Sequence, residues 1–397
     1  MPGDISPPPT KRRRLAPPTG DASNPTQAPP PTTTAISDTL RIYSWNINGI
    51  APFLQSQKPI ASFFERDASP SNPTSTSKPT PASLRAFLRR HAWPSILLLQ
   101  EVKIARSDTH TCAAVRASLN ARLDTSDTGP AYTAHFTLPR DAHNARAFGG
   151  RLYGVCSIIR SDLCASAVTR VREVDWDVEG RVSVIEMEVR SQRLAVWNVY
   201  AVNGTEAAYR SPETGQVVGT RHERKRAFHA QLLGECRRLE DEGWRLVLAG
   251  DFNVAPERAD GWPNLREWPE AHVVNRRDFN EKFLNRENKE GLGAVDAWRW
   301  MRGDERKYTY FPRGREWGSS CDRVDLVLVS RELVEQGELV DVGISDSPME
   351  RGSSDHVPIF VEVRVGERGT GLHVDRKKVA DEVDGSHHMS AGQASME

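Results

Sequence analysis

The stretch that decides the fold is RLVLAGDFNV, Arg245 to Val254. Its apolar run Leu246 to Ala249 has the length of a strand, and a glycine, Asp251 and Asn253 follow, which predicts a buried strand that ends at a turn. Because Asp251 and Asn253 are two residues apart, their side chains share one side of an extended backbone while Phe252 points into the core. An acid and an amide then converge at a strand end, where α/β proteins place their chemistry. A D-x-N sequence is also typical of an ordinary turn, so the other strand ends carry the argument.

Polar side chains recur at the ends of five strand-like runs. They are Asn46 and Asn48 in LRIYSWNING, Glu101 and Lys103 in ILLLQEVK, Asp251 and Asn253, Asp325 in the strand Arg323 to Val329, and Asp355 with His356 in SSDHVPIFVEV. Helical spacing is found in SLRAFLRRHAW and near residues 111–123, 221–242 and 277–286. The runs VSVIEMEV and RLAVWNVY are close enough for a hairpin, and Tyr200 and Asn203 lie at its end.

Both ends of the chain are predicted to be disordered. Residues 1–38 are rich in Pro, Thr and Ser and cannot bury enough apolar surface to fold, and residues 367–397 are polar and charged. The basic cluster Lys11 to Arg14 is typical of a nuclear-localisation signal, the alternative being a solvated charge run. The ordered domain is predicted over residues 39–366, with an inserted Pro/Ser/Thr loop at 68–81.

The bulk composition excludes several classes of protein. Lys plus Arg and Asp plus Glu number 53 each, so a polyanionic partner would need a local basic patch. The five cysteines are scattered and form no CxxC pair, which argues against a disulfide framework or a structural zinc site and favours an intracellular protein. No apolar run approaches the roughly 18 residues of a membrane span, and no membrane partner is expected. The candidates for a basic patch are Arg221, Arg224, Arg276, Arg277 and Arg313.

The strand-end residues are the ligands that a hard cation prefers. Carboxylates and amides without cysteine suit Mg²⁺, with Mn²⁺ as the alternative, bound through one or two carboxylates for a phosphate substrate. Beside such a metal His356 would act as a hydrogen-bonding acid or base, and Asp325 would fix its tautomer. These are the parts of metal-assisted phosphodiester hydrolysis.

The motifs, in their order along the chain, resemble the exonuclease III class of apurinic/apyrimidinic endonucleases, within the DNase I-like endonuclease/exonuclease/phosphatase superfamily. The matching residues are Asn46 in WNING, Glu101 in LLLQEVK, Tyr200 and Asn203 in VYAVN, Asp251 and Asn253 in GDFNV, Arg323 and Asp325 in DRVD, and Asp355 and His356 in SSDH. The resemblance covers about Leu40 to Val365. It implies a four-layered α/β sandwich of two packed mixed β-sheets flanked by helices.

The resemblance also implies a role for each residue. Metal ligation falls to Glu101, helped by Asp355 and Asn48, and the wider set of candidate ligands adds Asp251, Asn253 and His356. Asp251 would position and deprotonate the attacking water, with Asn253 orienting it, and the choice of Asp251 or His356 as the formal base stays open. The residues expected to face the scissile phosphate are His356, held by Asp325, together with Tyr200 and Asn46.

Structural interpretations stand beside these roles. The asparagines Asn46, Asn48 and Asn203 also suit turns, and Tyr200 suits a core position with its hydroxyl satisfied. Arg323 and Asp325 would form a surface ion pair on this interpretation.

Two positions depart from the class. Asn48 stands where some relatives carry Asp, which would tune the metal site. Asp322 stands where some abasic endonucleases have a Trp against the flipped-out sugar, and an acid suits a deoxyribose pocket poorly. Tyr310, Phe311 and Trp317 are the candidates for an apolar wall instead.

These observations predict a nuclear, monomeric, Mg²⁺-dependent DNA repair nuclease. Its substrate would be double-stranded DNA, cut 5′ to abasic sites, with 3′ phosphodiesterase or 3′–5′ exonuclease activity as a possible addition. One alternative is another phosphoesterase of the superfamily, acting on RNA, a phosphotyrosyl-DNA end or a small phosphate. A further alternative is a non-catalytic DNA-binding module.

Overall fold

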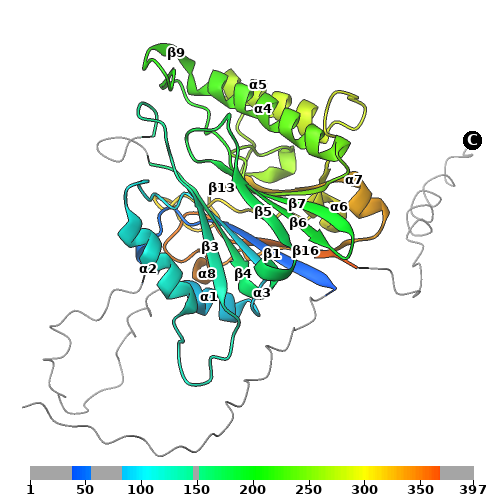
Figure 1. Cartoon of the computed structure of the whole chain (residues 1–397). Coiled ribbons are helices and arrows are strands. Elements are labelled where there is room, and N and C mark those ends of the chain that lie inside the picture. Colours follow the sequence, from blue (N-terminus) through cyan, green and yellow to red (C-terminus); the bar gives the residue numbers. More distant parts are fainter. Residues whose placement is uncertain (1–37, 55–82, 146–151, 367–397) are drawn as a thin grey trace, which may run out of the picture. The chain divides into compact units, whose positions relative to one another are not determined.

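The computed structural model describes residues 38–54, 83–145 and 152–366, all within one compact unit, Ile36–Glu397 (Figure 1). The basic cluster Lys11 to Arg14, the inserted loop 68–81 and the C-terminal tail lie outside the described residues. Within the described part, none of the helices combines the length and the apolar character needed to cross a bilayer.

The first sheet has six strands in the order β15-β16-β1-β2-β4-β3. Their bounds are β15 Leu339–Ile344, β16 Ile359–Arg364, β1 Thr39–Asn46, β2 Ile96–Gln100, β4 Val155–Arg160 and β3 Tyr132–Thr137. The sheet is mixed, because β1 and β2 are parallel, with Asn46 opposite Gln100, while the other neighbours are antiparallel. The polar ends of β1 and β2 therefore lie at the same edge.

The second sheet also has six strands, in the order β12-β14-β10-β7-β6-β5. Their bounds are β12 Val295–Asp296, β14 Asp325–Val329, β10 Arg245–Asp251, β7 Gln192–Tyr200, β6 Val182–Val189 and β5 Val168–Glu173. Strand β10 pairs parallel to β7 and antiparallel to β14, which aligns Asp251 with Tyr200 on one side and with Asp325 on the other. The predicted β6–β7 hairpin is present.

Alternation along the central strands explains why the two sheets pack face to face. Leu40 and Ile42 of β1 and Val247 and Ala249 of β10 point into one core between the sheets. The intervening side chains, such as Trp45, point to the outer faces, where helices cover them. The order is helix, sheet, sheet, helix, and the predicted four-layered α/β sandwich is confirmed.

The helical layers come from a few segments. The first sheet is covered by α1 Leu84–Arg90 and α2 Thr109–Asn120, and the second by α4 Arg221–Asp241, α5 Glu270–Phe279 and the π-helix Asn280–Leu284. Shorter helices are α3 Ser161–Ser166, α6 Ala297–Arg302, α7 Arg331–Glu335 and α8 Pro348–Arg351, with 3-10 turns at Ala51–Phe53 and Arg258–Asp260. Two small strand pairs complete the structure, β8 Ala208–Arg210 with β9 Val217–Thr220 and β11 Gly261–Trp262 with β13 Cys321–Asp322.

The start of α4 differs from the expectation of a basic surface. Arg221 and Arg224 are only 5% and 6% exposed, and Arg221 donates to Glu179 at 2.8 and 2.9 Å. The prediction that these two arginines contact a DNA backbone is therefore wrong. Buried guanidinium groups require such a partner, because an unpaired charge in the interior is costly.

Gly250 fixes the close approach of β10 to β7 just before Asp251. Its φ is +152°, and a Cβ at this position would lie 1.8 Å from the carbonyl oxygen of Val199. Only glycine fits here, so the residue in front of the acid is required by backbone packing.

Candidate active site

The predicted strand-end residues meet in one cavity with a volume of about 240 Å³. This is slightly below the roughly 300–1,000 Å³ of typical small-molecule sites. The lining residues from the predicted set are Glu101, Tyr200, Asn203, Asp251, Asn253, Asp355 and His356. The strand register explains this convergence, because β1, β2, β7 and β10 end here and the antiparallel strand β14 begins here.

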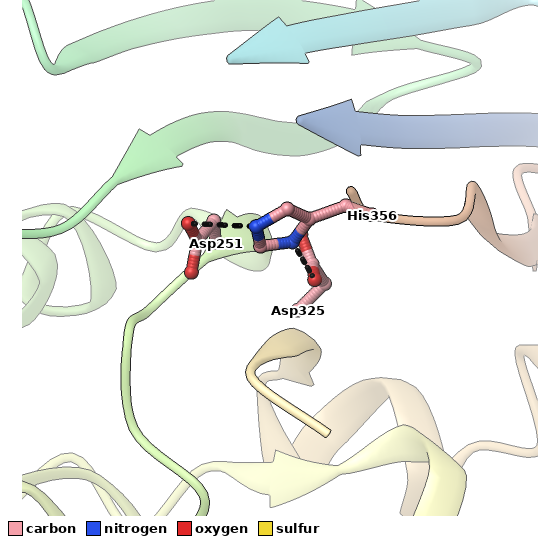
Figure 2. A group of neighbouring side chains, drawn as sticks. All are labelled: Asp251, Asp325 and His356. Carbon is pink, nitrogen blue, oxygen red and sulfur yellow. Dashed lines mark hydrogen bonds and ion pairs between the residues drawn. The ribbon is translucent and has the colours of Figure 1, made fainter. Parts of the chain in front are cut away.

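The centre of the site is a line of three buried side chains, Asp251, His356 and Asp325 (Figure 2). Nδ1 of His356 lies 2.7 Å from Oδ2 of Asp325, and its Nε2 lies 4.0 Å from Oδ2 of Asp251. The imidazole is held by one carboxylate and faces the other, as Figure 2 shows. Asp325 is thus the partner that orients His356, and the alternative of a surface ion pair with Arg323 is wrong.

The protonation of this line follows from its burial. Burial raises the pKa of Asp251 above its usual value, and the negative charge of Asp325 adds to the rise against the opposing effect of His356. Burial alone would lower the pKa of His356, but the charges of Asp325, Asp251 and Asp355 raise it. His356 is therefore an imidazolium at neutral pH and a hydrogen-bond donor, which leaves Asp251 as the candidate base.

Hydrogen bonds from side chains to backbone carbonyl oxygens hold the loop that carries His356. The hydroxyl of Ser354 donates to the carbonyl oxygen of Asn46 at 2.6 Å, and the indole of Trp45 donates to the carbonyl oxygen of His356 at 3.0 Å. The SSDH segment is thus fixed to the end of β1. The ring of Tyr310 lies 5.0 Å from that of His356 and limits its rotation.

Glu101 is connected to Asp251 through an asparagine. Nδ2 of Asn46 donates to Glu101 at 3.2 Å and to Asp251 at 3.0 Å, and the hydroxyl of Tyr200 donates to Glu101 at 2.6 Å. Burial would raise the pKa of Glu101, but the hydrogen bond from Tyr200 and the charge of Lys103 keep it below its usual value. Glu101 is therefore an ionised carboxylate, as a metal ligand must be.

The oxygens near Glu101 fit a divalent cation. Asn48 donates to Oδ1 of Asp355 at 2.9 Å, and the ammonium of Lys103 contacts both Oδ1 of Asn48 and Oε2 of Glu101, the latter at 3.1 Å. These oxygens already surround a positive charge, and they are the hard donors that Mg²⁺ prefers. A second group, Asp251, Asp325 and His356, also has ligand atoms within 4.8 Å of one another and is a further candidate site for the cation.

Backbone strain is concentrated at the site. Asn48, Glu101, Lys103 and Asn253 have φ between +51° and +54°, a backbone conformation that residues other than Gly and Asn rarely adopt. Strained residues of this kind occur where the surrounding structure holds them for function. Asn253 uses its conformation to donate to Oδ2 of Asp251 at 3.2 Å and to the carbonyl oxygen of Ala201 at 3.0 Å.

The predicted apolar wall is only partly present. Tyr310 lines the cavity, but Phe311 and Trp317 do not, because they stack on each other at 3.8 Å and pack against the core between the sheets. Arg323 is also absent from the lining, since it is 1% exposed and pairs with Asp260 and Asp296, both at 2.7 Å. The arginine of the DRVD motif therefore anchors loops and does not face the substrate.

The other wall of the cavity contains Asp322, at the pocket where the sequence placed it, and further residues that the sequence interpretation missed or placed elsewhere. It is formed by Lys225, Leu265, Arg266, His272, Asn275, Arg276, Asp322 and Val324. Lys225 is only 2% exposed, and it donates to the carbonyl oxygen of Asn253 at 2.7 Å. Helical spacing was a usable signal, since Lys225 lies three positions before Phe228 and seven before Leu232, both buried on one face of α4.

The fold and the site together define a class. A helix–sheet–sheet–helix sandwich with a buried Asp–His–Asp line and a carboxylate ligand set at its strand ends is the arrangement of a DNase I-like phosphoester hydrolase. The chain belongs to the Endonuclease/Exonuclease/phosphatase family, whose model matches residues 43–356. A sequence comparison with curated proteins finds no match.

Solved structures share the fold at low sequence identity. The catalytic domain of APE2 from Xenopus laevis is 18% identical, with a TM-score of 0.55 over 83% of this chain and 94% of that one. The AP endonuclease LMAP from Leishmania major is 18% identical, with a TM-score of 0.53 over 82% and 88%. The 3′ phosphatase NExo from Neisseria, bound to a product DNA hairpin, is 23% identical, with a TM-score of 0.51 over 82% and 99%.

Proposed function

We propose that this protein is a Mg²⁺-dependent DNA repair nuclease that hydrolyses phosphodiester bonds. The observation that carries the proposal is that Asp251 and His356, the latter held from behind by Asp325, line the same cavity as the carboxylates of Glu101 and Asp355. The solved structures of similar fold support DNA as the substrate, since they include the AP endonuclease LMAP and the 3′ phosphatase NExo bound to a product DNA hairpin.

Each of these residues has a separate role in hydrolysis. Asp251 accepts a proton from the attacking water, whose oxygen forms the new bond to phosphorus. The bond from phosphorus to the 3′-oxygen breaks, and this oxygen takes a proton from a solvent water, so one product carries a 3′-hydroxyl and the other a 5′-phosphate. His356 donates a hydrogen bond to the phosphate oxygens as negative charge builds up, and Asp325 keeps it protonated and oriented. A divalent cation held by Glu101, Asp355 and Asn48 would neutralise charge on the phosphate.

Two activities on DNA are candidates. Incision 5′ to an abasic site is the activity that the sequence motifs predict. Removal of a nucleotide from a 3′ end is the second candidate, and the polar wall of the cavity favours it, because Asp322 and Arg276 line the space where a base-free sugar would need apolar contacts.

The test is cleavage of two labelled duplexes in Mg²⁺ and in EDTA, one with a single abasic-site analogue and one with a recessed 3′ end. We expect metal-dependent cleavage of at least one duplex to give a 3′-hydroxyl, and no cleavage by His356→Ala. Hydrolysis of an RNA, of a phosphotyrosyl-DNA end or of a small phosphate ester, with both duplexes left intact, would replace DNA repair by another phosphoesterase function. Binding of DNA without any hydrolysis would leave a non-catalytic module.

We further propose that the protein acts in the nucleus, on the basis of the cluster Lys11 to Arg14. A fluorescent fusion in which these four residues are replaced by alanine would then lose its nuclear accumulation.

A further inference from the structure

Asp322 presents a carboxylate to the cavity without a partner. Its backbone is held firmly, since it pairs with Gly261 in β11 and exchanges hydrogen bonds with Tyr310 at 2.9 and 3.2 Å. Its side chain lines the cavity, and none of the described residues forms a hydrogen bond or an ion pair with it. A largely buried carboxylate without a donor is unfavourable, so the position is costly for stability and calls for a ligand.

Arg276 offers the opposite group on the same wall. Part of its guanidinium donates to the carbonyl oxygen of Arg266, but Nε is buried and has no hydrogen-bond partner among the described residues. Although Asp322 and Arg276 line one cavity, no ion pair joins them. The wall therefore carries one free acceptor and one free donor.

Apolar side chains are interspersed with these polar groups in the cavity lining. Val254, Ala255, Leu265 and Val324 line the same cavity, and Tyr310 adds an aromatic ring. Apolar walls with a few convergent donors and acceptors are typical of sites that bind one nucleotide, whose base or sugar carries donors and acceptors together. A deoxyribose without a base has too few such groups to satisfy both residues.

We propose that Asp322 and Arg276 are specificity-determining residues that admit an intact nucleotide beside the scissile phosphate and select against a base-free deoxyribose. The proposal rests on the proposed hydrolysis of DNA at this cavity. Its physical basis is that a site built to form hydrogen bonds rejects an analogue that lacks the matching groups, because its own buried polar atoms then stay unpaired.

The experiment compares two oligonucleotides of the same length and sequence. One has a normal nucleotide, and the other a tetrahydrofuran abasic analogue, on the 3′ side of the scissile phosphate. The ratio of kcat/KM for the two is measured for the wild type, Asp322→Leu and Arg276→Met. The matched controls are Asp304→Leu and Arg277→Met, since both residues are exposed and outside the cavity lining.

The wild type is expected to prefer the intact nucleotide. Each cavity variant should shift the ratio by about 10- to 100-fold toward the abasic analogue, the effect of losing one hydrogen bond to a charged group. The controls should leave the ratio unchanged. A wild type that prefers the abasic analogue, or cavity variants that match their controls, would overturn the proposal.

The affinities of the same two oligonucleotides, measured by fluorescence anisotropy in EDTA, separate this proposal from the proposed function. One outcome is that neither the wild type nor any variant hydrolyses DNA, while the wild type binds the oligonucleotide with the intact nucleotide more tightly and Asp322→Leu removes this preference. The nuclease function then fails, and the specificity assignment stands. If hydrolysis is observed but the wild type shows no preference in either measurement, the assignment fails alone.

Discussion

Asp325→Asn tests how the site keeps His356 protonated. The carboxylate of Asp325 lies 2.7 Å from Nδ1 of His356, and its charge is the main cause of the raised pKa of this histidine, about 10. Asparagine has nearly the same shape and removes only the charge. Burial would then be opposed only by the charges of Asp251 and Asp355, so the pKa of His356 should fall and a larger share of the imidazole should be neutral at pH 8.

The size of the effect follows from the lost interaction. A hydrogen bond to a charged group contributes about 1.5–3 kcal/mol, so kcat should fall by about 10- to 100-fold at pH 8. The pH profile changes as well. In the wild type, activity requires an ionised Asp251 and a protonated His356, and it should rise near pH 7 and fall near pH 10. In Asp325→Asn the falling limb should move to a lower pH, and the maximal activity should fall.

The assay is kcat against pH at saturating Mg²⁺ with a labelled DNA substrate, and Asp304→Asn, at an exposed site, is the control. A falling limb that stays near pH 10 in Asp325→Asn would refute the reasoning, because the charge of Asp325 would then not hold the proton on His356. Thermal unfolding of the variant shows whether the fold is retained.

Two further predictions concern the metal site and the loops. Glu101→Gln keeps the hydrogen bond from Tyr200 but removes the charge, so the Mg²⁺ concentration for half-maximal activity should rise by about 10- to 100-fold, and an unchanged requirement would exclude Glu101 as a ligand. Arg323→Ala leaves Asp260 and Asp296 buried and unpaired, so the free energy of unfolding should fall by about 3–5 kcal/mol in urea. A loss below 1 kcal/mol would contradict the structural role of Arg323, and the exposed Arg277→Ala serves as its control.

The sequence was sufficient to predict the positions of those elements that have a strong hydrophobic pattern. The apolar runs of β2 and β10 and the β6–β7 hairpin occur where the pattern placed them, and the polar residues after them lie in one cavity. Alternation and strand ends are local properties, so they can be read from neighbouring residues.

The errors fall where long-range contacts decide. Arg221 looks like a solvated helix start until Glu179, 42 residues earlier, supplies its buried partner. The helix expected at 277–286 begins at Glu270 in the structure. The sequence did not predict its first turns, because the Trp- and Pro-rich segment before it shows no helical periodicity. That shift hid His272 and Asn275, which face the cavity. The sequence also could not predict that the carboxylate of Asp322 has no partner, because this depends on the distances to other side chains in the folded protein.

The most direct test of the central claim is single-turnover cleavage of DNA in Mg²⁺ by the wild type, Asp251→Asn and His356→Ala. If these residues are the base and the phosphate-binding cation of one site, each variant should cleave at least about 100-fold more slowly than the wild type while binding DNA with similar affinity. Cleavage within tenfold of the wild-type rate by either variant would contradict the assignment of this cavity as the catalytic site.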